Sequence, residues 1–313
     1  MTQPRHAFDP QRIARVGRLD LVARRAVEGF LAGVHPSPYY GSSVEHADHR
    51  PYSPGDELRR IDWKLLAKSD RHFIRLFEEQ TNTRLTLVVD ASASMARVPQ
   101  DNAAAQPPDK LRYAASLAAG LAYLAVKQND AVGLALCDHQ LRTHVPARGT
   151  ARHYRLLLEH LESAQPGVDT RLAPPLHELA GRLRSRGVVV LISDLLDEPA
   201  ELAQALDHLR HKRHEVIVIQ LIDPRERDFP FTEVARFTDP ETNEQRVLHP
   251  RAVRDAYHAR LRSFLESSRR MCLQRSVDHT LIATDEPFDQ ALRAYLARRV
   301  HAARRGGRVG AGA

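Results

Sequence analysis

The chain has 313 residues, of which 42% are hydrophobic, enough for one large domain and a smaller module and too apolar for a disordered protein. Its 46 lysines and arginines exceed its 39 acids, giving a net charge of +7. Because both signs are interspersed along most of the chain, this charge does not require a nucleic-acid ligand.

The cysteine content and the hydropathy of the chain indicate the cellular compartment of the protein. Cys137 and Cys272 are the only cysteines, and both sit in apolar surroundings that are typical of small buried side chains in a reducing compartment. The first ten residues lack an apolar signal core, and no stretch approaches the roughly 20 apolar residues of a membrane span. We therefore expect a cytoplasmic protein without a membrane span.

From residue 85 onward, short apolar runs alternate with longer stretches of helical periodicity. The expected strands are Leu85 to Asp90, Ala131 to Cys137, Val188 to Asp194, Val216 to Asp223 and Asp278 to Ala283. The expected helices are Lys110 to Lys127, Ala151 to Ser163, Leu172 to Arg184, Glu198 to Arg210, Arg251 to Arg275 and Phe288 to Arg299, with a hairpin at Arg236 to Val247. This alternation predicts an α/β fold, a doubly wound and mostly parallel sheet with helices on both faces.

The first part of the chain has a different pattern. An amphipathic helix is expected near Gln11 to Leu31, followed by strand-like pieces around Ser43 to Tyr52 and His72 to Glu78. We interpret residues 1–82 as a smaller N-terminal α+β module, residues 83–300 as the sheet domain, and residues 301–313 as a flexible basic tail.

Polar residues follow the first predicted strand of the sheet domain. Asp90, Ser92 and Ser94 form a D-x-S-x-S sequence at its carboxyl end, where open α/β sheets bind ligands. Alone, this pentapeptide is more typical of a helix cap. Two further residues change that interpretation: Thr170 lies in a loop before a helix, and Asp194 closes another predicted strand. Because parallel strands end at one edge, the five oxygen-bearing side chains predict a site for a hard cation, Mg²⁺ or Mn²⁺.

These segments resemble the metal-ion-dependent adhesion site (MIDAS) of von Willebrand factor A domains. Residues 41–70, which contain GDELRRIDW, resemble a prokaryotic family of unknown function that pairs a G-D-x-x-R-x-I-D-W segment with such a domain. The resemblance covers roughly residues 18–299. It implies a von Willebrand factor A-like fold and an association with MoxR-type AAA+ ATPases.

The expected function is metal-dependent protein docking rather than catalysis. If Ser92, Ser94 and Thr170 coordinate directly while Asp90 and Asp194 act through water, the cation keeps an open position for a partner's carboxylate. The resemblance implies an adaptor that works with a MoxR-type AAA+ ATPase, or with a client protein offering an acidic residue, in chaperone-like assembly or maturation of other proteins.

The GDELRRIDW segment is expected to serve structure or interaction. Asp56, Arg59 and Asp62 recur every three residues on one helical face, which suits an ion-pair network, and Trp63 can anchor the module.

The sequence leaves three alternatives open. A metal-dependent phosphohydrolase or nuclease could use the same carboxylates, but no general base is evident beside the hydroxyl-rich ligand set. Binding of nucleic acid by the basic tail would weaken steeply with salt. A zinc site at His46, Asp48 and His49 is disfavoured because strand alternation places His49 on the opposite face. The sequence also has no phosphate-binding G-x-x-x-x-G-K-[ST] loop, so ATP hydrolysis would come from a partner.

Overall fold

The computed structural model of the chain describes residues 19–25, 27–28, 48–51, 73–76, 83–96, 109–167, 171–238, 244–287 and 290–291. They fall into two compact units, one drawn from residues 1–34 and 83–313 and the other from residues 35–82.

The larger unit contains a six-stranded sheet with the order β10-β7-β6-β3-β4-β5. Its strands are β3 (Arg84–Asp90), β4 (Ala131–Cys137), β5 (Leu141–Arg148), β6 (Val188–Ser193), β7 (Glu215–Ile222) and β10 (Asp278–Ala283). Every neighbouring pair is parallel except β4 and β5. The predicted mostly parallel sheet is therefore confirmed, with its strands within a residue or two of the expected positions.

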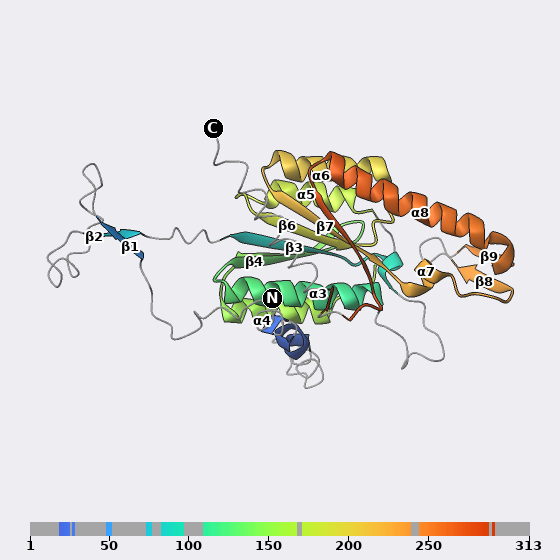
Figure 1. Cartoon of the computed structure of the whole chain (residues 1–313), viewed down its shortest axis with the longest axis horizontal. Coiled ribbons are helices and arrows are strands. Elements are labelled where there is room, and N and C mark those ends of the chain that lie inside the picture. Colours follow the sequence, from blue (N-terminus) through green and yellow to red (C-terminus); the bar gives the residue numbers. More distant parts are fainter. Residues whose placement is uncertain are drawn as a thin grey trace, which may run out of the picture. The chain divides into compact units, whose positions relative to one another are not determined.

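Helices cover both faces of this sheet (Figure 1). On one face lie α3 (Lys110–Lys127) and α4 (Ala151–Glu162), and on the other lie α5 (Ala173–Arg182), α6 (Pro199–His211) and α8 (Pro250–Gln274). Two separate clusters of buried apolar side chains fill the two faces. Alternating side-chain direction along each buried strand supplies both clusters, which is why these strands are continuously hydrophobic.

The antiparallel edge strand β5 was not predicted. It pairs with β4 after a tight turn in which the Asp138 carboxylate accepts a hydrogen bond from the Gln140 backbone nitrogen at 2.9 Å. Only Val145 is fully buried in this strand, so its sequence carries a weaker hydrophobic signal than the central strands.

Beyond β7 the chain makes a one-turn helix, α7 (Pro224–Asp228), and the hairpin of β8 (Ala235–Thr238) and β9 (Gln245–Leu248). The predicted hairpin is confirmed, whereas α7 was not expected. Phe229 adopts a left-handed conformation after α7, with φ of 46°, and stacks on Tyr257 of α8 with ring centroids 4.5 Å apart. This aromatic contact fastens the amino-terminal half of α8 to the carboxyl edge of the sheet.

Residues 19–25 and 27–28 are helical, and they belong to the larger unit. Leu19, Ala23 and Val27, spaced by one helical turn, are buried in the same cluster as α3 and α4. Tyr123 of α3 donates a hydrogen bond to the Glu28 carboxylate at 3.1 Å. This helix was expected in the N-terminal module, but its buried face packs on the sheet domain.

In the smaller unit, β1 (Asp48–Pro51) and β2 (Phe73–Leu76) form an antiparallel pair inside the two predicted strand-like pieces. The remaining domain boundaries stay predictions. Within the described ranges, no helix combines the length and apolar character that a membrane crossing requires, and both cysteines are free and buried.

Candidate metal centre

Two acidic residues mark the carboxyl ends of neighbouring strands. Asp90 is the last residue of β3, and Asp194 directly follows β6, which pairs in parallel with β3. Both carboxylates are almost inaccessible to solvent. From β3 the chain moves to β4 on one side and later to β6 on the other, so these residues lie at a topological switch point, where α/β sheets form binding crevices.

The Asp90 carboxylate accepts one hydrogen bond at each oxygen. One oxygen accepts a hydrogen bond from the Ser92 backbone nitrogen at 2.8 Å, and the other accepts one from the Ser193 hydroxyl at 2.6 Å. Burial, together with the nearby charge of Asp194, raises the pKa of Asp90 to about 7, although the hydrogen bonds from Ser193 and Ser92 oppose that rise. A positive charge next to Asp90 would therefore stabilise its ionised form.

The two predicted serine ligands lie side by side. Ser92 precedes the short helical turn η2 (Ala93–Met95), and its hydroxyl oxygen lies 3.0 Å from that of Ser94. Adjacent ligands of an octahedral magnesium ion, each about 2.1 Å from the metal, are also about 3 Å apart. The pair thus matches the spacing of two neighbouring coordination positions, as well as that of a hydrogen bond.

A buried lysine, absent from the sequence-based site, neutralises part of this edge. The Lys110 ammonium at the start of α3 contacts Asp194 at 2.8 Å and Glu226 of α7 at 2.6 Å. Burial alone would lower the pKa of Lys110, but the two carboxylates outweigh it and raise that pKa. Asp90, Asp194 and Glu226 supply three negative charges against one ammonium, so the ionised edge keeps an excess of two.

The described residues on either side of Thr170, Gly167 and Leu172, each donate a backbone hydrogen bond. Gly167 donates a backbone hydrogen bond to the Ala91 carbonyl at 2.6 Å, and the Leu172 backbone nitrogen donates one to the Asp197 carboxylate at 2.7 Å. Ala91 lies between Asp90 and Ser92, and Asp197 is three residues after Asp194. Thr170 itself lies outside the described residues, but its flanking residues reach the predicted edge.

Four other candidate residues, Asp56, Arg59, Asp62 and Trp63, also lie outside the described residues, and their predicted roles stay predictions. Across the part of the chain that the structure describes, no three His, Cys, Asp or Glu side chains are grouped to hold a metal ion. A cation at the sheet edge would therefore need serine and threonine hydroxyls to complete its ligands. That donor set of oxygens suits Mg²⁺ or Mn²⁺ better than a softer metal.

The fold and this edge define an α/β protein whose acids and hydroxyls converge at the switch point of a mostly parallel sheet. A profile of the family described as "Protein of unknown function DUF58" matches residues 48–265. The chain therefore belongs to this family.

The chain is also similar to individual bacterial proteins. An uncharacterized protein of Mycobacterium bovis is 30% identical over 225 residues, which cover 71% of this chain and 68% of that protein. The uncharacterized protein YeaD of Bacillus subtilis is 24% identical over 185 residues, or 58% of this chain and 42% of that protein.

Solved structures with a similar chain path include the conserved hypothetical protein BatB from Bacteroides thetaiotaomicron. It is 15% identical with a TM-score of 0.46 and covers 70% of this chain and 99% of that one. An aerotolerance-related membrane protein from Bacteroides fragilis is 18% identical with a TM-score of 0.44, covering 68% and 96% of the two chains.

Proposed function

We propose that this protein is a metal-dependent docking factor with a von Willebrand factor A-like domain. Mg²⁺, or Mn²⁺ in its place, would be held at the carboxyl edge of the sheet by Asp90, Ser92, Ser94, Thr170 and Asp194. When bound, the ion supplies positive charge and an open coordination position for a carboxylate. The protein acts by binding, not by turnover.

The observation that carries this proposal is the pair of serine hydroxyls 3.0 Å apart beside two buried carboxylates. Asp194 is paired with Lys110, but the ionised form of Asp90 is costly because burial disfavours its charge. The raised pKa of Asp90 reflects that cost. A divalent cation would remove the excess negative charge and leave the edge attractive to an acid.

We further propose a partner for this docking, on the basis of the resemblance of residues 41–70 to the family associated with MoxR-type ATPases. A MoxR-type AAA+ ATPase, or a client of that ATPase, would provide the acidic residue, and the complex would act in the cytoplasm in chaperone-like assembly or maturation of other proteins. The chain would supply recognition and the ATPase would supply the energy.

Two measurements test the proposal. Titration calorimetry should show magnesium uptake by the wild-type chain and its loss in Asp90→Asn and Ser92→Ala, whereas the exposed control Asp255→Asn should bind as wild type does. The MoxR-type ATPase from the same organism should then be captured by wild type in magnesium, but not in excess chelator or by Asp90→Asn. Equal capture in chelator would overturn the docking mechanism, and magnesium-dependent hydrolysis of a phosphoester panel would favour an enzyme instead.

A further inference from the structure

An apolar groove lies beside the candidate metal centre, along the middle of α8. Its helical wall consists of Tyr257, Arg260, Leu261, Phe264 and Leu265, a spacing of three and four residues that places all five on one helical face. The groove has a volume of about 390 Å³. It is therefore large enough for one or two sizeable side chains.

The opposite wall belongs to the metal edge itself. Asp194, Leu196 and Glu226 line it, together with the carboxyl-terminal residues of β7. Leu196 is 47% exposed, although it is only two residues from Asp194. A ligand that reached the metal through a carboxylate would thus have an apolar surface within reach of its neighbouring residues.

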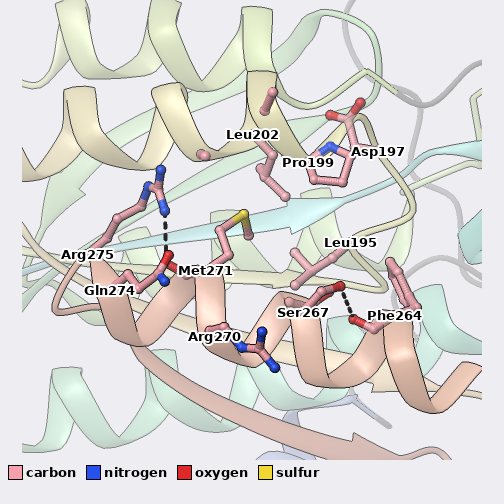
Figure 2. A pocket seen from close by; sticks show the side chains of 13 residues that line it. Leu195, Asp197, Pro199, Leu202, Phe264, Ser267, Arg270, Met271, Gln274 and Arg275 are labelled. Atoms are coloured by element: carbon pink, nitrogen blue, oxygen red, sulfur yellow. Dashed lines mark hydrogen bonds between the residues drawn. The ribbon is translucent and has the colours of Figure 1, made fainter.

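The face of α8 that lines the groove is more exposed to solvent than the continuation of that face toward the carboxyl end of the helix. Ser268 and Cys272, in the carboxyl-terminal half, are buried, whereas Leu261, Phe264 and Leu265 are only partly buried. A second cavity continues the groove between α6 and α8, and Figure 2 shows Phe264 at one end of it and Arg275 at the other. The more exposed part of this face is thus the part that lies next to the metal edge.

The helical wall of the groove contributes one basic side chain, Arg260. Helix α8 carries six arginines and two acidic residues. Arg260 is exposed and forms no ion pair with any residue that the structure describes, while Arg270 pairs with Glu266 at 2.9 Å. Arg260 is therefore a cation available to a partner at the rim of an apolar surface.

We propose that this groove is the second half of the docking surface and takes an acidic, apolar peptide segment of a partner protein. One carboxylate of the segment binds at the metal edge, a neighbouring large aliphatic or aromatic side chain enters the groove against Leu196 and Phe264, and a second carboxylate pairs with Arg260. The inference rests on the proposed docking function, and it names the chemistry that makes docking selective.

Binding of an acidic segment in the groove should depend on the divalent ion, because the ion changes the charge next to the groove. Without a divalent ion, the carboxylates of Asp90, Asp194 and Glu226, when ionised, exceed the Lys110 ammonium by two negative charges, which repels an acidic segment. A bound divalent ion cancels that excess, so that Arg260 then gives the surface a net attraction for acids. Selectivity for the segment thus requires both the ion and the apolar contact.

A displayed library of random peptides, selected on the immobilised full chain in magnesium, tests the proposal. We expect enriched sequences in which two acidic residues flank a large apolar residue. Synthetic peptides of the enriched sequence should bind roughly tenfold more weakly to Leu196→Ser, because a leucine contact of this kind contributes about that factor. Arg260→Glu should weaken binding several-fold and abolish the preference for the second acid.

Matched variants separate these effects from changes in folding or overall charge. Leu281→Ser changes another exposed leucine, 41% accessible, on β10, and Arg262→Glu changes another exposed arginine of α8 that does not line the groove. Both should bind the peptides as wild type does. Equal losses in the controls and in the groove variants would overturn the proposal.

Other outcomes distinguish this inference from the docking function. Magnesium-dependent enrichment of acidic peptides without any apolar preference overturns the groove and leaves the metal docking intact. Apolar, Arg260-dependent enrichment that is indifferent to chelator keeps the groove and overturns the metal mechanism. The absence of any enriched peptide overturns the groove proposal. A change of oligomeric state in Leu196→Ser, measured by light scattering, also overturns it, because such a change would mean that a second copy of the chain occupies this surface.

Discussion

The Ser193 hydroxyl lies 2.6 Å from the Asp90 carboxylate, to which it donates a hydrogen bond between β6 and β3. The same hydroxyl accepts a hydrogen bond from the Leu195 backbone nitrogen at 2.8 Å. One side chain therefore joins the strand that ends in Asp90 to the turn that contains Asp194. The two acids of the candidate metal centre share a common support.

Replacing Ser193 with alanine should weaken both the fold and the site. The change leaves a buried carboxylate oxygen and a buried backbone nitrogen without a partner, which should lower the free energy of unfolding by about 1–3 kcal/mol. It also removes a hydrogen bond that lowers the pKa of Asp90, so the pH at which magnesium binding reaches half its maximum should rise.

Urea unfolding and calorimetry at several pH values measure these two effects. Ser163→Ala is the control, because that hydroxyl is exposed and donates only to carbonyls within its own helix. An unchanged pH midpoint in Ser193→Ala would mean that Ser193 does not tune Asp90.

The pKa of Asp90, raised to about 7 against an ordinary value of 3.8, predicts how stability depends on pH without metal. A carboxyl whose pKa is higher in the folded state stabilises the fold most at low pH. Its contribution is lost as pH rises from about 4 to about 7, because only the folded protein still binds the proton. The expected loss is on the order of 4 kcal/mol.

The difference between wild type and Asp90→Asn in chelator isolates this contribution from the histidines that titrate in the same range. The wild type should lose stability relative to Asp90→Asn as pH rises through that range. Magnesium should restore stability to wild type at pH 8 and have little effect at pH 5, because the ion requires an ionised carboxylate. A pH-independent difference between the two proteins would contradict the raised pKa.

Lys110→Met should reveal whether the lysine and the divalent ion neutralise the same charges. Removing the ammonium leaves Asp194, only 3% exposed in its side chain, without its cation, and breaking a buried pair in this way costs about 3–5 kcal/mol. The excess negative charge at the edge rises, so magnesium should bind more tightly and recover part of the lost stability.

Thermal unfolding with and without magnesium tests this, with Lys212→Met as the control because Lys212 is exposed at the end of α6. The control should unfold at nearly the wild-type temperature under both conditions. If magnesium gave Lys110→Met no more stabilisation than wild type, the ion and the lysine would not act on the same carboxylates.

The sequence predicts the strands of the sheet and the acidic residues at its carboxyl edge better than it predicts the ion pairs formed there. β3, β6 and β7 are recognisable because strands buried on both faces are hydrophobic at nearly every position. Parallel neighbouring strands also place Asp90 and Asp194 at one edge. The weaker alternation of β5 and the five residues of α7 gave no comparable signal.

Lys110 and Glu226 could not be assigned to the site from the sequence. They lie 116 residues apart, and no local pattern pairs a lysine in one helix with a glutamate in another. Their only sequence signal was position, because Lys110 opens a helix and Glu226 lies three residues after the aspartate that follows β7. Burial of the ammonium becomes evident only when the helices are packed on the sheet.

Gly167→Ala should damage the metal centre through the backbone. A methyl group at this position would collide with the buried carboxylate of Asp138, which is fixed by Arg142 at 2.5 Å and by the Gln140 backbone nitrogen at 2.9 Å. Because Asp138 cannot move away, Gly167 must shift and weaken its 2.6 Å hydrogen bond to Ala91. We expect a loss of about 1–3 kcal/mol in the free energy of unfolding and weaker magnesium binding.

Two further variants show which part of this loss belongs to the site. Gly181→Ala, in α5, introduces a methyl group with no atom within 4 Å, so it should stabilise the helix by about 1 kcal/mol and leave magnesium binding unchanged. Thr170→Ala should weaken magnesium binding with little change in stability, because it removes only the proposed ligand. If Thr170→Ala bound magnesium as wild type does while Gly167→Ala did not, residues 168–170 would support the edge without supplying a ligand, and the ion would rest on the two serines and the two aspartates.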